Sequence, residues 1–421
     1  MNKSCQEDVQ FGSSYCNARQ KSLGLADSLT GHVNAGAAMS VCRWRWILRR
    51  WLHVLLGAAF CLPLVHAQTT ANARGLVFGY ATGWVPAAET LASLAHVDRL
   101  MFMELRMGSD GQIGNPYGWP AQWGELRSAA TSRGIPLDLV LTQFKVAHFN
   151  ALFGSARRVR QLESEVLRLA ADSVVSGIHL DVEIIEAADA AAVRRYRDFV
   201  VSLGRQLKAM QPLRLLSVFF YHGADKRLYD AATLASVDHV IVQGYDSHWL
   251  EAGVAGPVAP LAGADAVNWV QMLGTVQSLG VPPQRVLMGF PTYGYEWRVT
   301  PCTPRGTRVA PGSTTVFGRV QLPQAPAVKA SVMERVLMHG AHYDSDTGSA
   351  YYQFTHADGG CVVGWFEDWW TLQRKLDWLQ AHQLAGLAMF PLGYDNGELV
   401  SLAARRLRQV RLPETIKFDA Q

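Results

Sequence analysis

Short apolar runs alternate with amphipathic stretches along the chain from Gly75 onward. Apolar runs of about four to eight residues bounded by turn residues are typical of buried strands, whereas apolar positions that recur every three to four residues are typical of helices. The predicted strands are 76–80, 99–104, 137–142, 177–183, 215–220, 239–245, 286–291 and 386–391. The predicted helices are 122–133, 156–171, 188–210, 226–235, 266–279 and 372–383.

Eight strands separated by helices predict an α/β fold with a parallel sheet closed into a (β/α)8 barrel, the TIM barrel. An open, doubly wound sheet is the alternative, but no glycine-rich phosphate loop follows the first strand. The catalytic barrel is expected to span 75–410. Residues 298–360 break the alternation and contain a helix-like piece at 332–339 and a hairpin-like run at 351–355. We predict a small α+β insertion there, between the seventh and eighth strands of the barrel.

The first 67 residues are predicted to be a dispensable N-terminus and signal peptide. Residues 1–38 are polar and lack periodicity, and Met39 is an alternative start. After Met39, arginines precede the apolar stretch 51–64, which ends in a small-residue cleavage pattern at Ala67. The apolar stretch is shorter than the roughly 20 residues of a membrane span, so no stable membrane insertion is expected after cleavage, although an uncleaved anchor is an alternative. We expect export to the periplasm, the cell envelope or the extracellular space.

Composition and cysteine usage narrow the function further. The chain has 421 residues, a formal net charge of +4 and no clustered basic face, so a nucleic-acid partner is not expected. Outside the N-terminal region only Cys302 and Cys361 remain, and in an exported chain they are predicted to form a disulfide. Neither has a second ligand at metal-binding spacing, so no metal and no organic cofactor are predicted.

The run 177–183 carries the candidate chemistry. Strand side chains alternate between faces, so His179, Asp181 and Glu183 point the same way, opposite to the apolar residues between them. Two buried carboxylates with different pKa values can supply an acid and a stabilising base. Taken alone, an Asp-x-Glu after an apolar run is also typical of a strand that enters a solvated loop. Tyr245 and Asp246 end the sixth predicted strand, on the same rim.

Four segments in order strengthen the catalytic interpretation: 176–183, 243–246, 288–297 and 365–390. They resemble the Asp-Gly-x-Asp-x-Asp-x-Glu strand, the Tyr-Asp pair, the Gly-x-Pro-x-Tyr-Gly pattern and the last unit of glycoside hydrolase family 18, the chitinase-like family. The sequences of the last two segments, 288–297 and 365–390, are most similar to the branch of the family that includes spore-cortex and peptidoglycan N-acetylglucosaminidases. The resemblance covers essentially the whole chain after the signal peptide.

The resemblance implies roles for individual residues. Glu183 is expected to be the general acid, and the substrate's own 2-acetamido oxygen to be the nucleophile, as in the substrate-assisted exceptions among retaining glycosidases. Asp181 is expected to hold the acetamido N–H, while Tyr245 and Asp246 hold the rest of that group. The substrate-binding residues that the resemblance implies are Tyr80, His179, Tyr293, Trp297 and Phe390.

The chain also departs from the family pattern. Ser176 and His179 replace two acids of the signature, the third strand lacks a Ser-Gly-Gly element, and Phe390 stands where a Trp usually floors the sugar site. His179 either pairs with Asp181 and keeps it ionised, or is a satisfied histidine of the barrel core. In the first case a protonated His179 would add a limb to the pH profile.

The expected function is that of an exported glycosidase that cleaves β-linked N-acetylglucosamine-containing glycans, either peptidoglycan or chitin-type, as polysaccharide or oligosaccharide. A non-catalytic, lectin-like barrel is one alternative, and a hydrolase of glycans without acetamido groups is another. The sequence does not distinguish exo from endo action or identify the natural glycan.

Overall fold

The computed structural model describes residues 74–249, 251–309, 315–318 and 330–409. The predicted signal peptide, Met39 and the predicted cleavage position after Ala67 lie outside the described residues. Within the described ranges, no helix combines the length and the apolar composition that crossing a bilayer requires.

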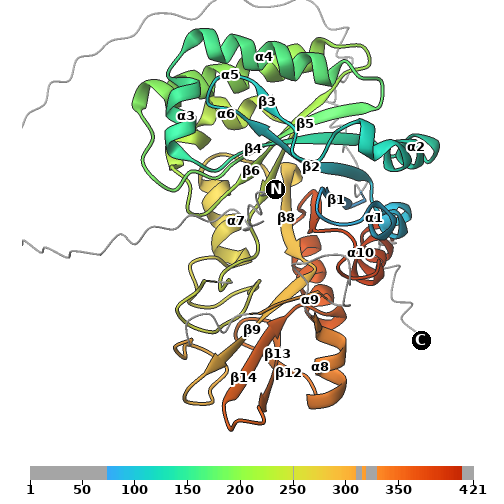
Figure 1. The fold of residues 1–421 in the computed structure, drawn as a ribbon, viewed down its shortest axis with the longest axis vertical. Helices are drawn as coiled ribbons and strands as arrows, with labels where there is room; N and C mark the ends of the chain where they lie inside the picture. Colours follow the sequence, from blue (N-terminus) through green and yellow to red (C-terminus); the bar gives the residue numbers. More distant parts are fainter. Residues whose placement is uncertain (1–73, 250, 310–314, 319–329, 410–421) are drawn as a thin grey trace, which may run out of the picture. The chain divides into compact units, whose positions relative to one another are not determined.

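Eight parallel strands form a closed barrel, as predicted (Figure 1). The first strand pairs with the second on one side and with the last on the other, through Phe78↔Arg99 and Leu76↔Gly386. The barrel strands are β1 (Leu76–Thr82), β2 (Arg99–Met107), β4 (Leu137–Gln143), β5 (Val175–Val182), β6 (Leu215–Phe220), β7 (His239–Val242), β8 (Val286–Pro291) and β15 (Gly386–Phe390). A two-residue strand, β3 (Ile113–Gly114), adds to β2 in the antiparallel sense.

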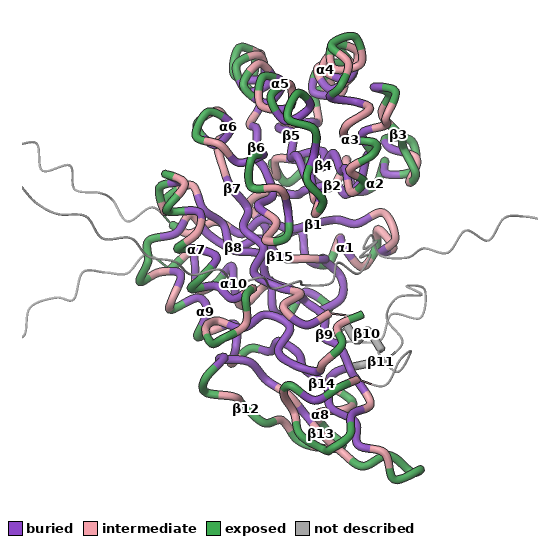
Figure 2. Tube along the Cα trace, turned by 90° about the vertical axis from the view of Figure 1, so that its left-hand side faces the viewer, coloured by how far each residue is buried: buried purple, intermediate pink, exposed green. Residues whose placement is uncertain are grey.

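Amphipathic helices cover the outside of the barrel. In α4, the buried residues Leu162, Val166 and Ala170 recur every four positions and form a single face, while Arg157, Arg160 and Arg168 are exposed. Figure 2 shows this division as buried strands inside and exposed outer sides of α4 and α5. The helices of the barrel are α1 (Ala87–Ser93), α2 (Gly124–Ser132), α3 (Val146–Phe153), α4 (Ala156–Ala170), α5 (Ala190–Ala209), α6 (Ala231–Ser236), α7 (Trp269–Ser278), α9 (Trp369–Ala381) and α10 (Glu398–Arg408). Four 3-10 turns accompany them: η1 (Leu94–His96), η2 (Ala121–Trp123), η3 (Lys226–Tyr229) and η4 (Pro283–Arg285).

The predicted elements differ from the observed ones mainly in the helices. The predicted helix 226–235 is divided into η3 and α6 at Asp230, whose side chain accepts a hydrogen bond from the Thr233 N–H and caps α6. Helices α1 and α3 were not predicted, because seven or eight residues hold too few turns for a clear period. Helix α10 was also missed, although it follows Gly397, which has a left-handed backbone conformation.

The insertion forms a second, antiparallel sheet with one helix packed on it. Its strand order is β11-β10-β9-β14-β13-β12. The elements are β9 (Tyr293–Val299), β10 (Thr315–Gly318), β11 (Ala330–Ser331), α8 (Val332–His339), β12 (His342–Asp344), β13 (Ser349–Thr355) and β14 (Cys361–Phe366). The predicted helix-like piece is α8, and the hairpin-like run lies in β13. The sheet extends beyond the predicted range 298–360 at both ends, because β9 follows β8 after only Thr292.

Two features hold the inserted sheet together and in place. A disulfide within the insertion joins Cys302, which follows β9, to Cys361, the first residue of β14. In addition, the side chains inside the barrel, such as Phe78 and Ile241, pack in one continuous cluster with Tyr293, Tyr295 and Trp297 of β9. The barrel mouth and the inserted sheet therefore share one apolar core.

Candidate active site

Strand β5 carries two carboxylates into the barrel. Ile178, Leu180 and Val182 pack outward among the residues under the helices, so the alternating residues His179 and Asp181 face the barrel interior. Glu183 follows the last residue of β5, and its backbone N–H donates to the carbonyl of Gln143 at 3.0 Å. This arrangement is the one that the alternation in 177–183 predicts.

Asp181 and Glu183 interact directly, and burial acts on the pKa of both. Burial raises the pKa of Asp181 to about 7, although a hydrogen bond from Glu183 opposes the shift. Burial also raises the pKa of Glu183 well above its usual value, and the charge of Asp181 raises it further. The hydrogen bond between them stabilises the ionised form of Asp181 and the protonated form of Glu183. Glu183 is therefore the member of the pair that holds the proton.

One oxygen of Asp181 is unsatisfied. Oδ1 of Asp181 is buried and has no hydrogen-bond partner in the structure. A buried carboxylate oxygen without a donor is energetically unfavourable, by about 1–3 kcal/mol or more. It therefore provides a ready acceptor for an N–H group of a ligand that enters the mouth of the barrel.

The segment that follows β7 supplies Tyr245 and Asp246. The predicted strand 239–245 ends at Val242, because Gln243–Asp246 leave the sheet and Asp246 adopts a positive φ of 56°. The Tyr245 ring lies parallel to the Phe390 ring, with 5.7 Å between centroids. Burial holds the pKa of the Tyr245 hydroxyl well above 10, and the nearby carboxyls of Asp246 and Asp181 raise it further, so the hydroxyl is a neutral donor.

The position of Tyr245 depends on a glycine in β8. A Cβ atom at Gly289 would lie 2.7 Å from Cε1 of Tyr245, closer than a van der Waals contact allows. Only glycine at this position lets the Tyr245 ring approach β8 this closely.

The inserted sheet holds Asp246 in place. Tyr293 and Tyr295, both in β9, donate to Oδ1 of Asp246 at 2.7 and 3.1 Å. Burial raises the pKa of Asp246 to about 6, and the two tyrosine hydrogen bonds oppose the shift. The sequence identified Tyr293 but not Tyr295, whose spacing of two residues on the same strand was the available signal.

His179 does not pair with Asp181 in the structure. It has no exposed surface, its Nε2 lies 3.1 Å from the Tyr80 hydroxyl, and its Nδ1 lies 2.8 Å from the Ser217 hydroxyl. Burial lowers the pKa of His179 to about 3, so the ring is neutral. Of the two interpretations of His179, the structure therefore agrees with the satisfied core histidine, because both ring nitrogens already have hydroxyl partners. His179 is a satisfied core residue and does not reach a ligand directly.

The aromatic residues divide into buried and partly exposed groups. Trp297 is completely buried in the core of the inserted sheet, so its expected contact with substrate is not possible in this structure. Tyr80 is also buried, and its ring packs edge-on against Phe390. Phe390 and Trp84 are partly exposed, with 6.3 Å between ring centroids, and are available for stacking on a sugar ring.

A further carboxylate, which sequence reasoning missed, lies beside the pair. Glu104 in β2 is only 3% exposed, and its charge raises the pKa of both Asp181 and Glu183. It accepts hydrogen bonds from Arg106 and Thr142. Glu104 was the last residue of the predicted strand 99–104, so it was expected at the same rim as Glu183. An acid at that end of a barrel strand was the signal that could have identified it.

Comparison with known proteins agrees with this geometry. Residues 141–395 match the model of glycosyl hydrolases family 18, which is more than half of the chain. The chain is 22% identical over 364 residues to the uncharacterized glycosylase YvbX of Bacillus subtilis, covering 83% of this chain and 96% of that protein. It is 23% identical over 284 residues to the cortical fragment-lytic enzyme of the same organism, covering 64% of this chain and 59% of that protein.

Solved structures support the fold. A chitinase from Chromobacterium violaceum aligns with a TM-score of 0.64 and 21% identity, over 80% of this chain and 99% of that one. The spore cortex-lytic enzyme SleL of Bacillus megaterium aligns with a TM-score of 0.61 and 19% identity, over 78% of this chain and 74% of that one. Given the match over most of the barrel and an acid pair at the end of β5, the chain belongs to glycosyl hydrolases family 18 and is a glycosidase.

Proposed function

We propose that this protein is an exported glycosidase that cleaves β-linked N-acetylglucosamine-containing glycans by substrate-assisted catalysis with retention of configuration. The main support is the unsatisfied Oδ1 of Asp181, which lies beside a protonated Glu183 and within the electrostatic reach of the Tyr245 hydroxyl. An acetamido group offers an N–H that can donate to Asp181 and an oxygen that can accept from the Tyr245 hydroxyl, so it complements both the acceptor and the donor of the site.

In the first step, the glycosidic C–O bond breaks as Glu183 transfers its proton to the leaving oxygen. The acetamido oxygen of the same sugar bonds to the anomeric carbon from the opposite face and forms an oxazolinium ion. Asp181 accepts the hydrogen bond of the acetamido N–H and stabilises the positive charge, while the Tyr245 hydroxyl orients the acetamido oxygen.

In the second step, water attacks the anomeric carbon and opens the oxazolinium ring. The carboxylate of Glu183 takes the proton from that water and returns to its starting state. This chemistry requires a 2-acetamido group, so glucans that lack it are expected to be very poor substrates.

We favour peptidoglycan or short N-acetylglucosamine oligomers as substrates. The sequence motifs resemble those of the spore-cortex branch of the family, and the cortical fragment-lytic enzyme and SleL are among the similar proteins. Chitinases are also among them, so chitin-type oligomers belong in the same test. Export rests on the signal-peptide pattern before Ala67.

The test incubates the protein that starts after Ala67 with chitooligosaccharides, purified peptidoglycan and cello-oligosaccharides, and identifies the products by mass spectrometry. We expect cleavage after N-acetylglucosamine and no cleavage of cello-oligosaccharides. Glu183→Gln is the matched control, and it should bind oligosaccharide with turnover reduced by several orders of magnitude. Binding without turnover by the unmodified protein would instead indicate a lectin, and cleavage of cello-oligosaccharides would contradict the substrate-assisted mechanism.

A further inference from the structure

A further buried carboxylate lies on the second strand from β5, at the same end of the barrel as the catalytic pair. Strands β2, β4 and β5 are adjacent in the barrel, and their registers pair Arg106 with Thr142 and Thr142 with Asp181. Glu104 in β2 therefore belongs to the same rim as Asp181 and Glu183, with β4 between its strand and β5. The proposed function gives this residue no role.

The carboxylate of Glu104 is fixed by three donated hydrogen bonds. Nε and Nη2 of Arg106 both donate to Oε1, at 2.9 and 2.7 Å. The Thr142 hydroxyl donates to Oε2 at 2.7 Å. Because a guanidinium donates two of these bonds, the group is anionic, and because it is only 3% exposed, its charge is weakly screened. Arg106, by contrast, has a side chain that is 57% exposed, so water screens its positive charge.

The tyrosines and the histidine that face the catalytic pair from the other elements are uncharged. Tyr80 from β1 and Tyr245 after β7 have pKa values held well above 10 by burial and remain neutral. Beyond β5, Tyr196 and Tyr229 are neutral for the same reason. His179 is neutral because burial lowers its pKa to about 3.

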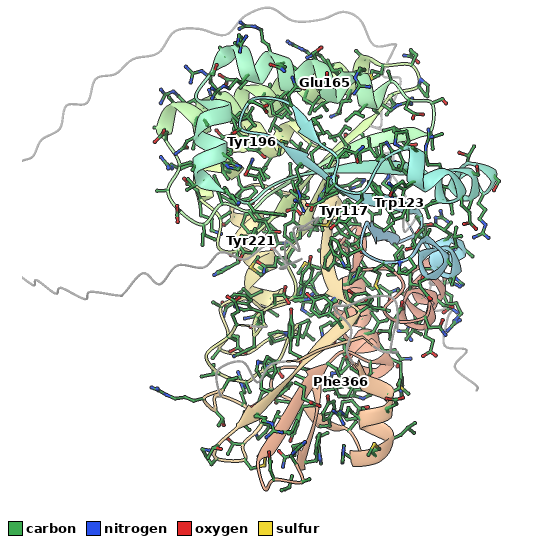
Figure 3. All side chains as sticks on the ribbon, in the orientation of Figure 1. Tyr117, Trp123, Glu165, Tyr196, Tyr221 and Phe366 are labelled. Carbon is green, nitrogen blue, oxygen red and sulfur yellow. A yellow bond between two sulfur atoms is a disulfide. The ribbon has the colours of Figure 1, made fainter. Side chains whose placement is uncertain are left out.

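The largest charge effects on the pair therefore come from carboxylates. Asp181 and Glu183 act on each other, Glu104 acts on both, and Asp246 acts on Glu183. Asp246 differs from Glu104 because it is partly exposed and its own pKa is raised to about 6. Tyr117 lies in the loop after β3 (Figure 3). Burial and the charge of Glu104 raise its pKa, so it is also neutral.

We propose that Glu104 is a positioning residue for catalysis: its fixed, buried negative charge keeps the catalytic proton on the Asp181–Glu183 pair. This inference rests on the proposed function of the same pair. In this barrel a neutral His179 occupies one of the signature's acid positions, and Glu104 supplies a permanent charge from another strand.

The sign of the effect follows from electrostatics. A nearby negative charge favours the protonated form of a carboxyl group, so it raises the pH at which the pair loses its proton. When Glu104 is neutralised, the pair should lose that proton at lower pH. Both limbs of the pH dependence of kcat/KM should therefore move toward acid, because the same charge acts on both carboxyls.

The test measures kcat/KM against pH for Glu104→Gln on the best oligosaccharide substrate. The amide removes the charge and keeps one acceptor oxygen for Arg106, while its NH2 group can donate to the Thr142 hydroxyl oxygen in place of the lost acceptor. We expect the alkaline limb to move down by about one pH unit, which is roughly a tenfold loss of activity above that limb, with a much smaller loss at the new optimum. Glu104→Asp retains the charge and should keep the limbs near their original positions.

Asp138, in the neighbouring strand β4, provides a matched control. Asp138 in β4 is buried and paired with Arg99, but it is not among the groups that act on Asp181 or Glu183. Asp138→Asn removes a buried paired carboxylate as Glu104→Gln does, and it should destabilise the barrel without moving either limb. A uniform loss of activity in Glu104→Gln, with unchanged limbs, would show a purely structural role and overturn the proposal.

A second readout does not depend on turnover. Carbon-13 labelling of the Asp and Glu carboxyl groups allows the titration of Asp181 and Glu183 to be followed by NMR, with assignment by Asp181→Asn and Glu183→Gln. Glu104→Gln should lower the pKa of both groups, and unchanged titrations would contradict the inference. If the unmodified protein cleaves no glycan, the proposed function fails, whereas the titration still decides whether Glu104 holds the proton on the pair.

Discussion

The hydroxyl of Tyr293 donates a hydrogen bond to Oδ1 of Asp246 at 2.7 Å and so connects the inserted sheet to the end of barrel strand β7. Asp246 comes directly after Tyr245, the residue proposed to orient the acetamido group. The inserted sheet is therefore part of the active site, because it fixes the segment that carries the tyrosine.

Tyr293→Phe removes the shorter of the two tyrosine hydrogen bonds to Asp246. The lost donor raises the pKa of Asp246 further, so less of this carboxyl is ionised at neutral pH. We expect kcat/KM to fall roughly tenfold, in line with one misplaced hydrogen bond to a charged group of about 1.5–3 kcal/mol. Tyr352→Phe, which removes a hydrogen bond to Glu296 in the same sheet, is the control and should leave kcat/KM nearly unchanged.

Gly289→Ala tests the contact between β8 and the Tyr245 ring. The added methyl group would lie 2.7 Å from the ring, so the tyrosine must tilt away from its position. We expect a loss of kcat/KM of roughly tenfold to a hundredfold. Gly274→Ala in α7 is the matched control, since a Cβ there meets nothing within 4 Å. It should keep full activity and stabilise the fold by about 0.5–1 kcal/mol.

His179→Asn separates the two interpretations of this histidine. Because the ring is neutral, the substitution should leave both limbs of the pH profile in place. It should lower the free energy of unfolding by about 1–3 kcal/mol, because the Tyr80 and Ser217 hydroxyls lose a well-placed partner. A limb near the usual pKa of histidine that disappears in the variant would contradict the neutral ring and restore the predicted pairing with Asp181.

Asp181→Asn tests the energetic consequence of the acid pair. The pKa of Asp181 is about 7 in the folded state and about 3.9 in an unfolded chain. Between these values the folded state binds more protons, so stability is lost as the pH rises through this window. The variant should therefore be more stable than the unmodified protein at pH 8, by roughly 1–4 kcal/mol, with the difference vanishing toward pH 4. Thermal unfolding followed by circular dichroism across this range measures the effect.

Asp225→Asn is the control of opposite sign. Hydrogen bonds from Arg227 lower the pKa of Asp225, so its contribution to stability is present above the unfolded pKa and is lost as the pH falls. This variant should be less stable than the unmodified protein at pH 8. If both substitutions shift stability in the same direction, the raised pKa of Asp181 is not responsible.

Local periodicity predicted the barrel strands and the shared face of Asp181 and Glu183, because both follow from side chains that alternate within a few residues, whereas the catalytic interpretation of the pair came from the family resemblance. The apolar alternation in 177–183 fixed which face Asp181 and Glu183 share, and the eight strands followed from short apolar runs. The environment of His179 was not predictable in the same way, since Tyr80 and Ser217 come from β1 and β6. Glu104 was missed for a related reason: an acid at a strand end is usually solvated, and only the packing of β2 against β4 buries it.

The closure of the barrel also constrains how the protein is made. Strand β1 pairs with β15, near the C-terminal end of the described chain, and β15 also supplies Phe390 beneath Tyr245. Until Gly386–Phe390 have been synthesised, β1 and β8 each lack β15 as a neighbouring strand, and Tyr245 lacks the Phe390 ring that stacks on it. A nascent chain must therefore hold two unpaired strand edges open for most of its translation, and any truncation upstream of Gly386 should yield an aggregation-prone fragment without activity.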